Sequence, residues 1–237
     1  KAYESFEGAA MNFSLNFTEK GYGAPLILLH GNGESSGYFV NQIDRFANEY
    51  RVIAVDTRGH GASPRGNKPF TLETFADDLK NLLDSLNIEK ANILGFSDGG
   101  NIAVIFALKY PERVASLVLN GANLFPSGLK SSFLIPVKVL FAVFSLLSHF
   151  SRRAKRRSEL LYLMAKQPNI QPERLSSIKC PVLVIAGTQD VIKEKHTKLI
   201  AASLPDSSLC FLKGGHSIAK TNSVEFNSAV EKFLNSL

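Results

Sequence analysis

The chain has 237 residues, 45% hydrophobic and 20% charged, which suits one domain with a sizeable core and excludes a disordered chain. Two cysteines exclude a disulfide-rich scaffold and a four-cysteine zinc site, and no CxxC or HxxxH spacing indicates a metal. The net charge is +6, but residues 130–166 hold eight basic residues and one acidic residue and so account for the excess. No nucleic-acid-binding motif accompanies them, so nucleic acid is not expected as a partner.

Apolar runs and helical patterns alternate along most of the chain. Residues 12–18 alternate between apolar and polar side chains, which predicts a half-buried strand. Six continuous apolar runs predict strands buried on both faces, at residues 26–29, 52–55, 91–96, 114–119, 182–186 and 208–212. Helical patterns cover residues 38–49, 71–86, 100–110, 193–203 and 223–235. This alternation predicts an α/β fold with a doubly wound, mostly parallel sheet.

The alternation is interrupted once, between Leu119 and Val182. The intervening residues are helical, apolar and basic by turns and contain no clear strand. Such a long excursion between two core strands is typical of a lid or cap. We therefore expect a core formed by residues 1–122 and 177–237, with a helical lid at residues 123–176.

The lid also holds an apolar stretch, residues 133–150, which Pro136 and Lys138 interrupt. A spanning helix needs about 20 predominantly apolar residues, and a span here would separate motifs that act together, so no transmembrane segment is expected. The basic cluster at residues 152–157 is interpreted as a solvated face. The alternatives are attraction to an acidic substrate and weak peripheral contact with an anionic membrane.

The start of the chain shows no signal-peptide pattern, and the two cysteines indicate no disulfide framework. Both observations favour a cytoplasmic location. The first residue is Lys1 rather than methionine, which leaves open whether a segment precedes it.

The central motif is Gly95-Phe96-Ser97-Asp98-Gly99-Gly100, between a predicted strand and a predicted helix. G-x-S-x-G in this context indicates a nucleophile elbow, a tight turn that presents the serine at the carboxyl edge of the sheet. Glycines two residues before and after the serine remove side chains that would clash. The alternative is a glycine-rich turn that carries an idle serine.

Two further motifs end strands later in the chain. Asp190 ends Gly-Thr-Gln-Asp after the strand at 182–186, and His216 lies in Gly-Gly-His-Ser after the last strand. The chain order Ser97, Asp190, His216 is the order of a nucleophile-elbow hydrolase. We expect His216 to act as the base and Asp190 to orient it.

The His30-Gly31-Asn32-Gly33 loop follows the strand at 26–29. In serine hydrolases of this kind the loop supplies one backbone N–H to the oxyanion hole, and the residue after the nucleophile supplies the other. This nominates the backbone N–H groups of Asn32 and Asp98. His30 is expected to shape the loop, and His196 is expected on a surface helix.

The segment at residues 56–63, Asp-Thr-Arg-Gly-His-Gly-Ala-Ser, follows the strand at 52–55. Its two glycines and a paired Asp56 and Arg58 predict a hydrogen-bonded turn that braces the floor of the site. His60 is given a structural role there as well.

The motifs HGNG, DTRGHGAS, GFSDGG, GTQD and GGH together resemble the α/β-hydrolase superfamily, in which they occur in this order. The resemblance covers the chain from Met11 to Leu237, apart from the lid. The S-D-G-G elbow is similar to that of the biphenyl-hydrolase-like and valacyclovirase-type small esterases. Related dehalogenases and epoxide hydrolases carry aspartate at the position of Ser97, so those activities are disfavoured.

This resemblance implies hydrolysis of a small carboxylic ester or thioester through an acyl-enzyme, without a cofactor or metal. An apolar substrate pocket is expected to include Phe96, Phe125, Phe133, Phe141 and Phe144. A carbon–carbon bond hydrolase and a cofactor-free perhydrolase use the same triad and remain alternatives. A ligand-sensing or partner-binding protein with little turnover is an alternative of another class. The substrate and the oligomeric state are left open.

Overall fold

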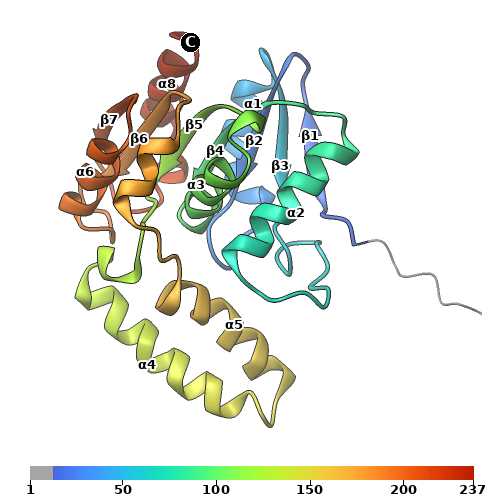
Figure 1. Ribbon diagram of the computed structural model, residues 1–237, viewed down its shortest axis with the longest axis vertical. Helices are drawn as coiled ribbons and strands as arrows, with labels where there is room; N and C mark the ends of the chain where they lie inside the picture. Colours follow the sequence, from blue (N-terminus) through green and yellow to red (C-terminus); the bar gives the residue numbers. More distant parts are fainter. Residues whose placement is uncertain (1–12) are drawn as a thin grey trace, which may run out of the picture.

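The computed structural model describes residues 13–237, which form a seven-stranded sheet with helices on both faces (Figure 1). The strand order is β1-β3-β2-β4-β5-β6-β7, with β1 antiparallel to β3 and all other neighbours parallel. The strands are β1 (Phe17–Lys20), β2 (Ala24–Leu29), β3 (Tyr50–Val55), β4 (Ala91–Phe96), β5 (Val114–Asn120), β6 (Val182–Gly187) and β7 (Ser207–Leu212). The predicted doubly wound, mostly parallel sheet is confirmed.

The first strand, β1 (Phe17–Lys20), begins later than the pattern at residues 12–18 predicts and shares only residues 17 and 18 with it. Phe17 pairs with Val55, the last residue of β3, and one further bond joins Asp56 N to the Asn16 carbonyl at 2.9 Å, so the residues before Asn16 have no strand against which to pair. Residue 12 lies outside the described residues.

Two helical layers cover the sheet because successive strand residues point to opposite faces. In β4, Ile93 belongs to a buried cluster that includes residues of α2, α3 and α6, whereas Leu94 belongs to a second cluster that includes residues of α1, α7 and α8. The α-helices are α1 (Val40–Phe46), α2 (Leu72–Ser85), α3 (Asp98–Lys109), α4 (Ser131–Leu147), α5 (Arg152–Lys166), α6 (Glu194–Ser203), α7 (Ile218–Thr221) and α8 (Ser223–Leu234). A 3₁₀ helix at Ser36–Phe39 precedes α1.

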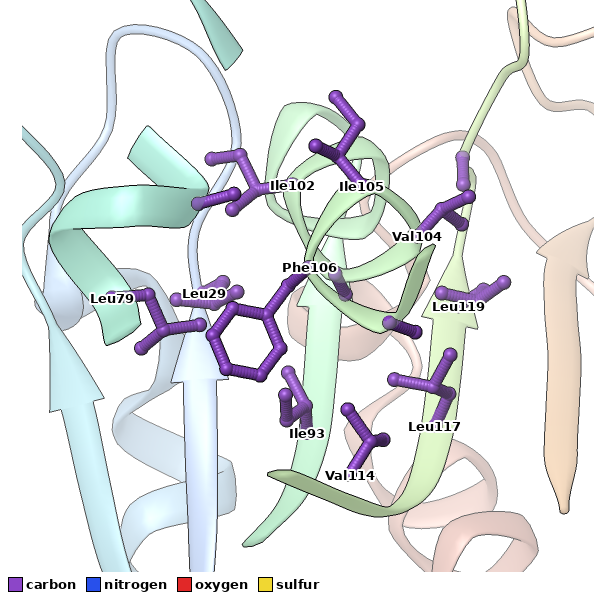
Figure 2. Close-up of a cluster of buried hydrophobic side chains, with 14 of the residues drawn as sticks. Leu29, Leu79, Ile93, Ile102, Val104, Ile105, Phe106, Val114, Leu117 and Leu119 are labelled. Carbon is purple, nitrogen blue, oxygen red and sulfur yellow. The ribbon is translucent and has the colours of Figure 1, made fainter. Parts of the chain in front are cut away.

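Helix α3 is the most buried helix of this core, and it begins directly after Ser97. Phe106 on α3 is fully buried and lies among Leu29, Ile93 and Leu117 of the sheet, as Figure 2 shows. A helix that is apolar on nearly all sides belongs in a protein interior. The packing therefore holds the start of α3, and with it the serine turn, in a fixed place.

Helices α4 and α5 form a hairpin between β5 and β6, at the end of the sheet where the parallel strands terminate (Figure 1). We call residues 131–166 the α4–α5 hairpin. Three links attach it to the core: the Arg65–Glu159 ion pair at 2.6 Å, the bond from Asn32 Nδ2 to the Leu160 carbonyl at 3.0 Å, and the bond from Arg156 Nη2 to the Gly59 carbonyl at 2.9 Å. Within residues 13–237, no helix has both the length and the apolar character needed to cross a membrane.

A buried ion pair fixes the segment after β3 against α2. Arg58 donates from Nε and Nη2 to Asp78 at 2.7 and 2.6 Å, and both side chains are 1% exposed. The guanidinium also lies 3.7 Å from the centre of the Phe13 ring. The predicted pairing of Asp56 with Arg58 is therefore wrong, because Asp78 on α2 offers Arg58 a two-point contact that a neighbour in the same turn does not.

The Asp56 side chain instead accepts hydrogen bonds that hold its own turn together. Its carboxylate accepts hydrogen bonds from the backbone N–H of Ser36 at 2.7 Å and of Ala62 at 2.9 Å, and from the Asn16 side chain at 2.9 Å. Burial acts to raise the pKa of Asp56, but the hydrogen bonds outweigh it and the pKa is lowered. The turn is thus built around an ionised carboxylate.

Candidate active site

The turn at Ser97 has the strained geometry of a nucleophile elbow. Ser97 has φ +54° and ψ −119°, and its N–H donates to the Asn120 carbonyl at 2.8 Å. A Cβ on Gly95 would lie 2.3 Å from the Gly99 carbonyl oxygen, and a Cβ on Gly99 would lie 2.0 Å from the Leu29 carbonyl oxygen. Both positions therefore require glycine for the chain to turn this tightly.

Ser97, His216 and Asp190 come together from the ends of β4, β7 and β6. The Nε2 of His216 lies 3.0 Å from the Ser97 hydroxyl, and its Nδ1 lies 2.6 Å from Asp190 Oδ1. The same carboxylate oxygen accepts the Ile192 N–H at 2.9 Å, which fixes its orientation. Since an ionised carboxylate can only accept, Nδ1 carries the proton and the Nε2 lone pair faces the serine.

The His216 ring can take this position because Gly121 has no side chain. Gly121 follows β5 with φ +62°, and a Cβ there would lie 2.8 Å from the His216 ring. Any larger residue would displace the imidazole from its place between the acid and the serine.

The loop that carries Asn32 passes directly against the nucleophile. A Cβ on Gly31 would lie 3.2 Å from the Ser97 Cβ. Asp98 follows Ser97 and is the first residue of α3. Its backbone N–H therefore lies at the N-terminus of a buried helix, which is the positive end of the helix dipole. The Gly31 backbone and the start of α3 thus both lie against Ser97.

The side chains of Asn32 and Asp98 also form a network. Asn32 Nδ2 donates to Asp98 Oδ2 at 2.8 Å and links the loop to α5 through the Leu160 carbonyl. Asp98 Oδ1 accepts from Asn101 at 3.2 Å, and Asn101 continues to Asn123 at 3.1 Å. Burial raises the pKa of Asp98, against the opposing effect of these donors. Sequence reasoning used only the main chains of Asn32 and Asp98 and missed this network.

A cavity of about 160 Å³ opens at Ser97 and His216. One part of its wall is polar and the other is apolar, and the apolar part includes residues of the α4–α5 hairpin. The lining residues are Asn32, Glu34, Phe96, Ser97, Asp98, Asn123, Leu129, Phe133, Met164, Val191, Ile192, His216 and Ser217.

Two of the predicted pocket aromatics, Phe96 and Phe133, line this cavity. Phe125 instead packs edge-on against His196, with the ring centres 4.6 Å apart. Phe141 lines a separate surface depression, since it lies two helical turns, about 12 Å, beyond Phe133 along α4.

Phe144 is also absent from the cavity lining. Its ring lies under the Arg157 guanidinium, 5.3 Å from the ring centre, on the outer part of the hairpin. Which aromatic side chains of α4 reach the cavity depends on how α4 packs on α5.

Glu34 is a lining residue that sequence reasoning missed, although it directly follows the HGNG motif. Its Oε2 is buried without a hydrogen-bond partner in the described part of the chain. Burial raises the pKa of Glu34, while a backbone hydrogen bond with Gly31 and the charge of Lys220 oppose the shift. The cavity therefore has a second carboxyl group besides Asp98.

Two other histidines serve the structure. His30 Nε2 accepts from Thr57 N at 3.0 Å and its Nδ1 lies 2.7 Å from the Gly31 carbonyl, so it shapes the loop as expected. The expected surface position of His196 is wrong. This side chain is buried, its Nε2 accepts from Leu124 N at 2.9 Å, and burial lowers its pKa to about 4.

No group of three or more histidine, cysteine, aspartate or glutamate side chains in residues 13–237 could hold a metal ion. The site consists of a hydroxyl, an imidazole and a carboxylate.

The chain belongs to the α/β hydrolase fold family, whose family model matches residues 24–153. Several known proteins similar to it are named as hydrolases. It is 32% identical over 273 residues to a 2-hydroxy-6-oxononadienedioate/2-hydroxy-6-oxononatrienedioate hydrolase of Burkholderia vietnamiensis, with 96% of this chain and 92% of that protein covered. It is 27% identical over 249 residues to the human serine hydrolase BPHL, with 95% of this chain and 84% of that protein covered.

A solved hydrolase structure from Pseudomonas aeruginosa PA01 is similar throughout. The TM-score is 0.76 at 26% identity, with 95% of this chain and 99% of that chain covered. The resemblance to the α/β-hydrolase superfamily that the motifs indicate is thereby confirmed, and the protein is a hydrolase of this family.

Proposed function

We propose that this hydrolase cleaves small carboxylic esters or thioesters through an acyl-enzyme formed on Ser97. The observation that carries the proposal is the continuous relay from the Ser97 hydroxyl to His216 at 3.0 Å and from His216 to Asp190 at 2.6 Å. A serine hydroxyl becomes a useful nucleophile when a base that is itself oriented by an acid can remove its proton.

In this mechanism His216 Nε2 takes the Ser97 proton as Oγ bonds to the carbonyl carbon. Asp190 stabilises the imidazolium that forms. The N–H groups of Asn32 and Asp98 donate to the oxyanion, and each such donor typically contributes about 2.7–4 kcal/mol to transition-state stabilisation. His216 then protonates the leaving alcohol or thiol, and a water attacks the acyl-enzyme by the same route. The reaction uses no cofactor or metal.

The cavity favours a short, uncharged acyl group. Its volume of about 160 Å³ equals that of roughly five water molecules. Its described lining includes the carboxyl groups of Glu34 and Asp98 and neither lysine nor arginine. Arg152 and Arg156 line a different depression together with Arg65, so they do not support selection of acidic substrates at Ser97.

Carbon–carbon bond hydrolysis is the second candidate, because the Burkholderia relative at 32% identity carries the name of a dienedioate hydrolase. A dioate has two carboxylates, which would call for cationic groups in the pocket. The two carboxyl groups that line this cavity disfavour such a substrate, so we prefer the ester.

With p-nitrophenyl esters of increasing acyl length, we expect kcat/KM to be highest for the shortest chains. It should fall by about tenfold or more once the acyl chain exceeds the cavity, since each misplaced methylene costs binding in the transition state. Phe133→Ala should move the optimum to longer chains because it enlarges the cavity. Phe141→Ala is the matched control on the same helix and should leave the profile unchanged.

If kcat/KM does not depend on acyl chain length in either the wild type or Phe133→Ala, the proposed pocket is contradicted. Folded protein that turns over no ester would instead favour the ligand-sensing alternative.

A further inference from the structure

The α4–α5 hairpin carries most of the large hydrophobic side chains that are exposed in the described chain. Nine of the fifteen large hydrophobic side chains exposed within residues 13–237 lie on the α4–α5 hairpin. They are Phe133, Ile135, Val139, Leu140, Val143, Leu146, Leu147, Phe150 and Tyr162. Contiguous exposed apolar patches mark interaction sites in soluble domains.

Four of these side chains form a stripe along α4, whereas Phe133 lines the cavity at Ser97 and Tyr162 lies on α5. Ile135, Val139, Val143 and Leu146 recur at intervals of three and four residues, which places them on one side of a helix. The buried α4 residues, Leu134 and Val137, lie on the opposite side. The outward face is therefore an apolar stripe with no partner in the described residues.

The exposure is greatest toward the end of the hairpin that lies farthest from the sheet (Figure 1). Leu146 is 68% exposed and Phe150, in the turn after α4, is 85% exposed. Arg152 and Arg153 follow immediately and are also exposed. The tip thus presents large apolar side chains and cations together.

The charge on this hairpin is strongly one-sided. Residues 131–166 hold seven basic residues and one acidic residue, and that acid, Glu159, is already paired with Arg65 of the core. The Arg157 guanidinium lies over the Phe144 ring, which brings a further cation against α4. An apolar helix face bordered by arginine and lysine is typical of a segment that lies in the interface of an anionic bilayer.

We propose that the α4–α5 hairpin docks on an anionic lipid surface. The outer face of α4 enters the boundary between headgroups and acyl chains, and the arginines at the tip contact the anionic headgroups. The positive charge favours an anionic lipid surface over a second copy of the chain, because a second copy would bring the same positive charge against itself. The proposal is independent of the reaction at Ser97.

Co-sedimentation with vesicles tests this surface. The full chain should bind phosphatidylglycerol vesicles at low salt, bind pure phosphatidylcholine vesicles much more weakly, and be released as salt increases. Each basic residue near an anionic surface strengthens binding about fivefold, so Arg152→Gln/Arg153→Gln should weaken binding by about 25-fold. Leu146→Ser/Phe150→Ser should weaken it by about tenfold or more, because the apolar contribution is lost.

Matched variants elsewhere on the surface provide the controls. Lys195→Gln/Lys213→Gln removes the same charge, and Tyr22→Ser/Val224→Ser removes exposed apolar groups away from the hairpin. Both should bind like the wild type, and all variants should retain ester hydrolysis and the wild-type melting temperature.

Three results would overturn the proposal. One is absence of binding to phosphatidylglycerol vesicles at low salt. Another is an equal loss in the lysine control, which would show attraction by net charge alone. The last is a concentration-dependent dimer in sedimentation velocity that Leu146→Ser/Phe150→Ser dissociates, which would show that a second copy covers the face.

Discussion

Replacement of Asp190 by asparagine should lower kcat for a short p-nitrophenyl ester by about 10⁴-fold. The Asp190 carboxylate accepts from His216 Nδ1 at 2.6 Å and is almost fully buried, so it selects the tautomer that directs a lone pair at Ser97. An amide at this position can donate to the ring and favour the wrong tautomer. Steady-state kinetics with circular dichroism would measure the loss and show that the fold persists.

Asp44→Asn is a matched control, because Asp44 is an exposed aspartate that pairs with Lys20 far from the site. Its kcat should equal that of the wild type. A loss of less than tenfold in Asp190→Asn would mean that the carboxylate does not orient the base.

The second large effect is on stability. Asp78→Asn should lower the free energy of unfolding by about 3–5 kcal/mol, because it leaves the buried Arg58 guanidinium without a counter-charge. Urea denaturation monitored by circular dichroism would measure the change. Asp44→Asn, which breaks an exposed ion pair, should cost less than about 1 kcal/mol.

A double variant separates the cost of breaking this pair from its net contribution. Arg58→Met/Asp78→Leu removes both charges and should recover most of the lost stability, since apolar replacements of buried pairs are often neutral. If the double variant is no more stable than Asp78→Asn, unpaired charge is not the cause of the loss.

Much of the sheet could be predicted because buried parallel strands leave a simple pattern. The apolar run at residues 91–96 coincides with β4, and the helical pattern at 71–86 encloses α2 (Leu72–Ser85). Both signals arise from neighbours in sequence, which determine what each element buries. The antiparallel β1 is short because β3 limits its pairing, and this is a property of another segment.

Contacts between segments that lie far apart in the chain could not be predicted from the sequence. Arg58 pairs with Asp78 and not with Asp56, and His196 is buried because Leu124 and Phe125 cover it. Each of these contacts depends on how separate elements pack, and the spacing of apolar residues within one element gives no information about that packing. The same limit explains why Phe125 and Phe141 lie outside the cavity.

The site was more accessible to prediction than its surroundings. Its three central residues each follow a strand, and the carboxyl ends of parallel strands meet at one edge of the sheet. Ser97, Asp190 and His216 could therefore be grouped without coordinates. The buried Glu34 carboxyl and the Asn32–Asp98 side-chain network could not be grouped, because they arise from the loop conformation and not from strand order.

The central claim is that His216 activates the Ser97 hydroxyl, and fluorophosphonate labelling tests it most directly. The wild type should be labelled on Ser97, as peptide mass spectrometry would show, whereas Ser97→Ala and His216→Ala should not be labelled. Labelling of a different residue, unchanged labelling of His216→Ala, or a folded wild type that does not react would contradict the claim.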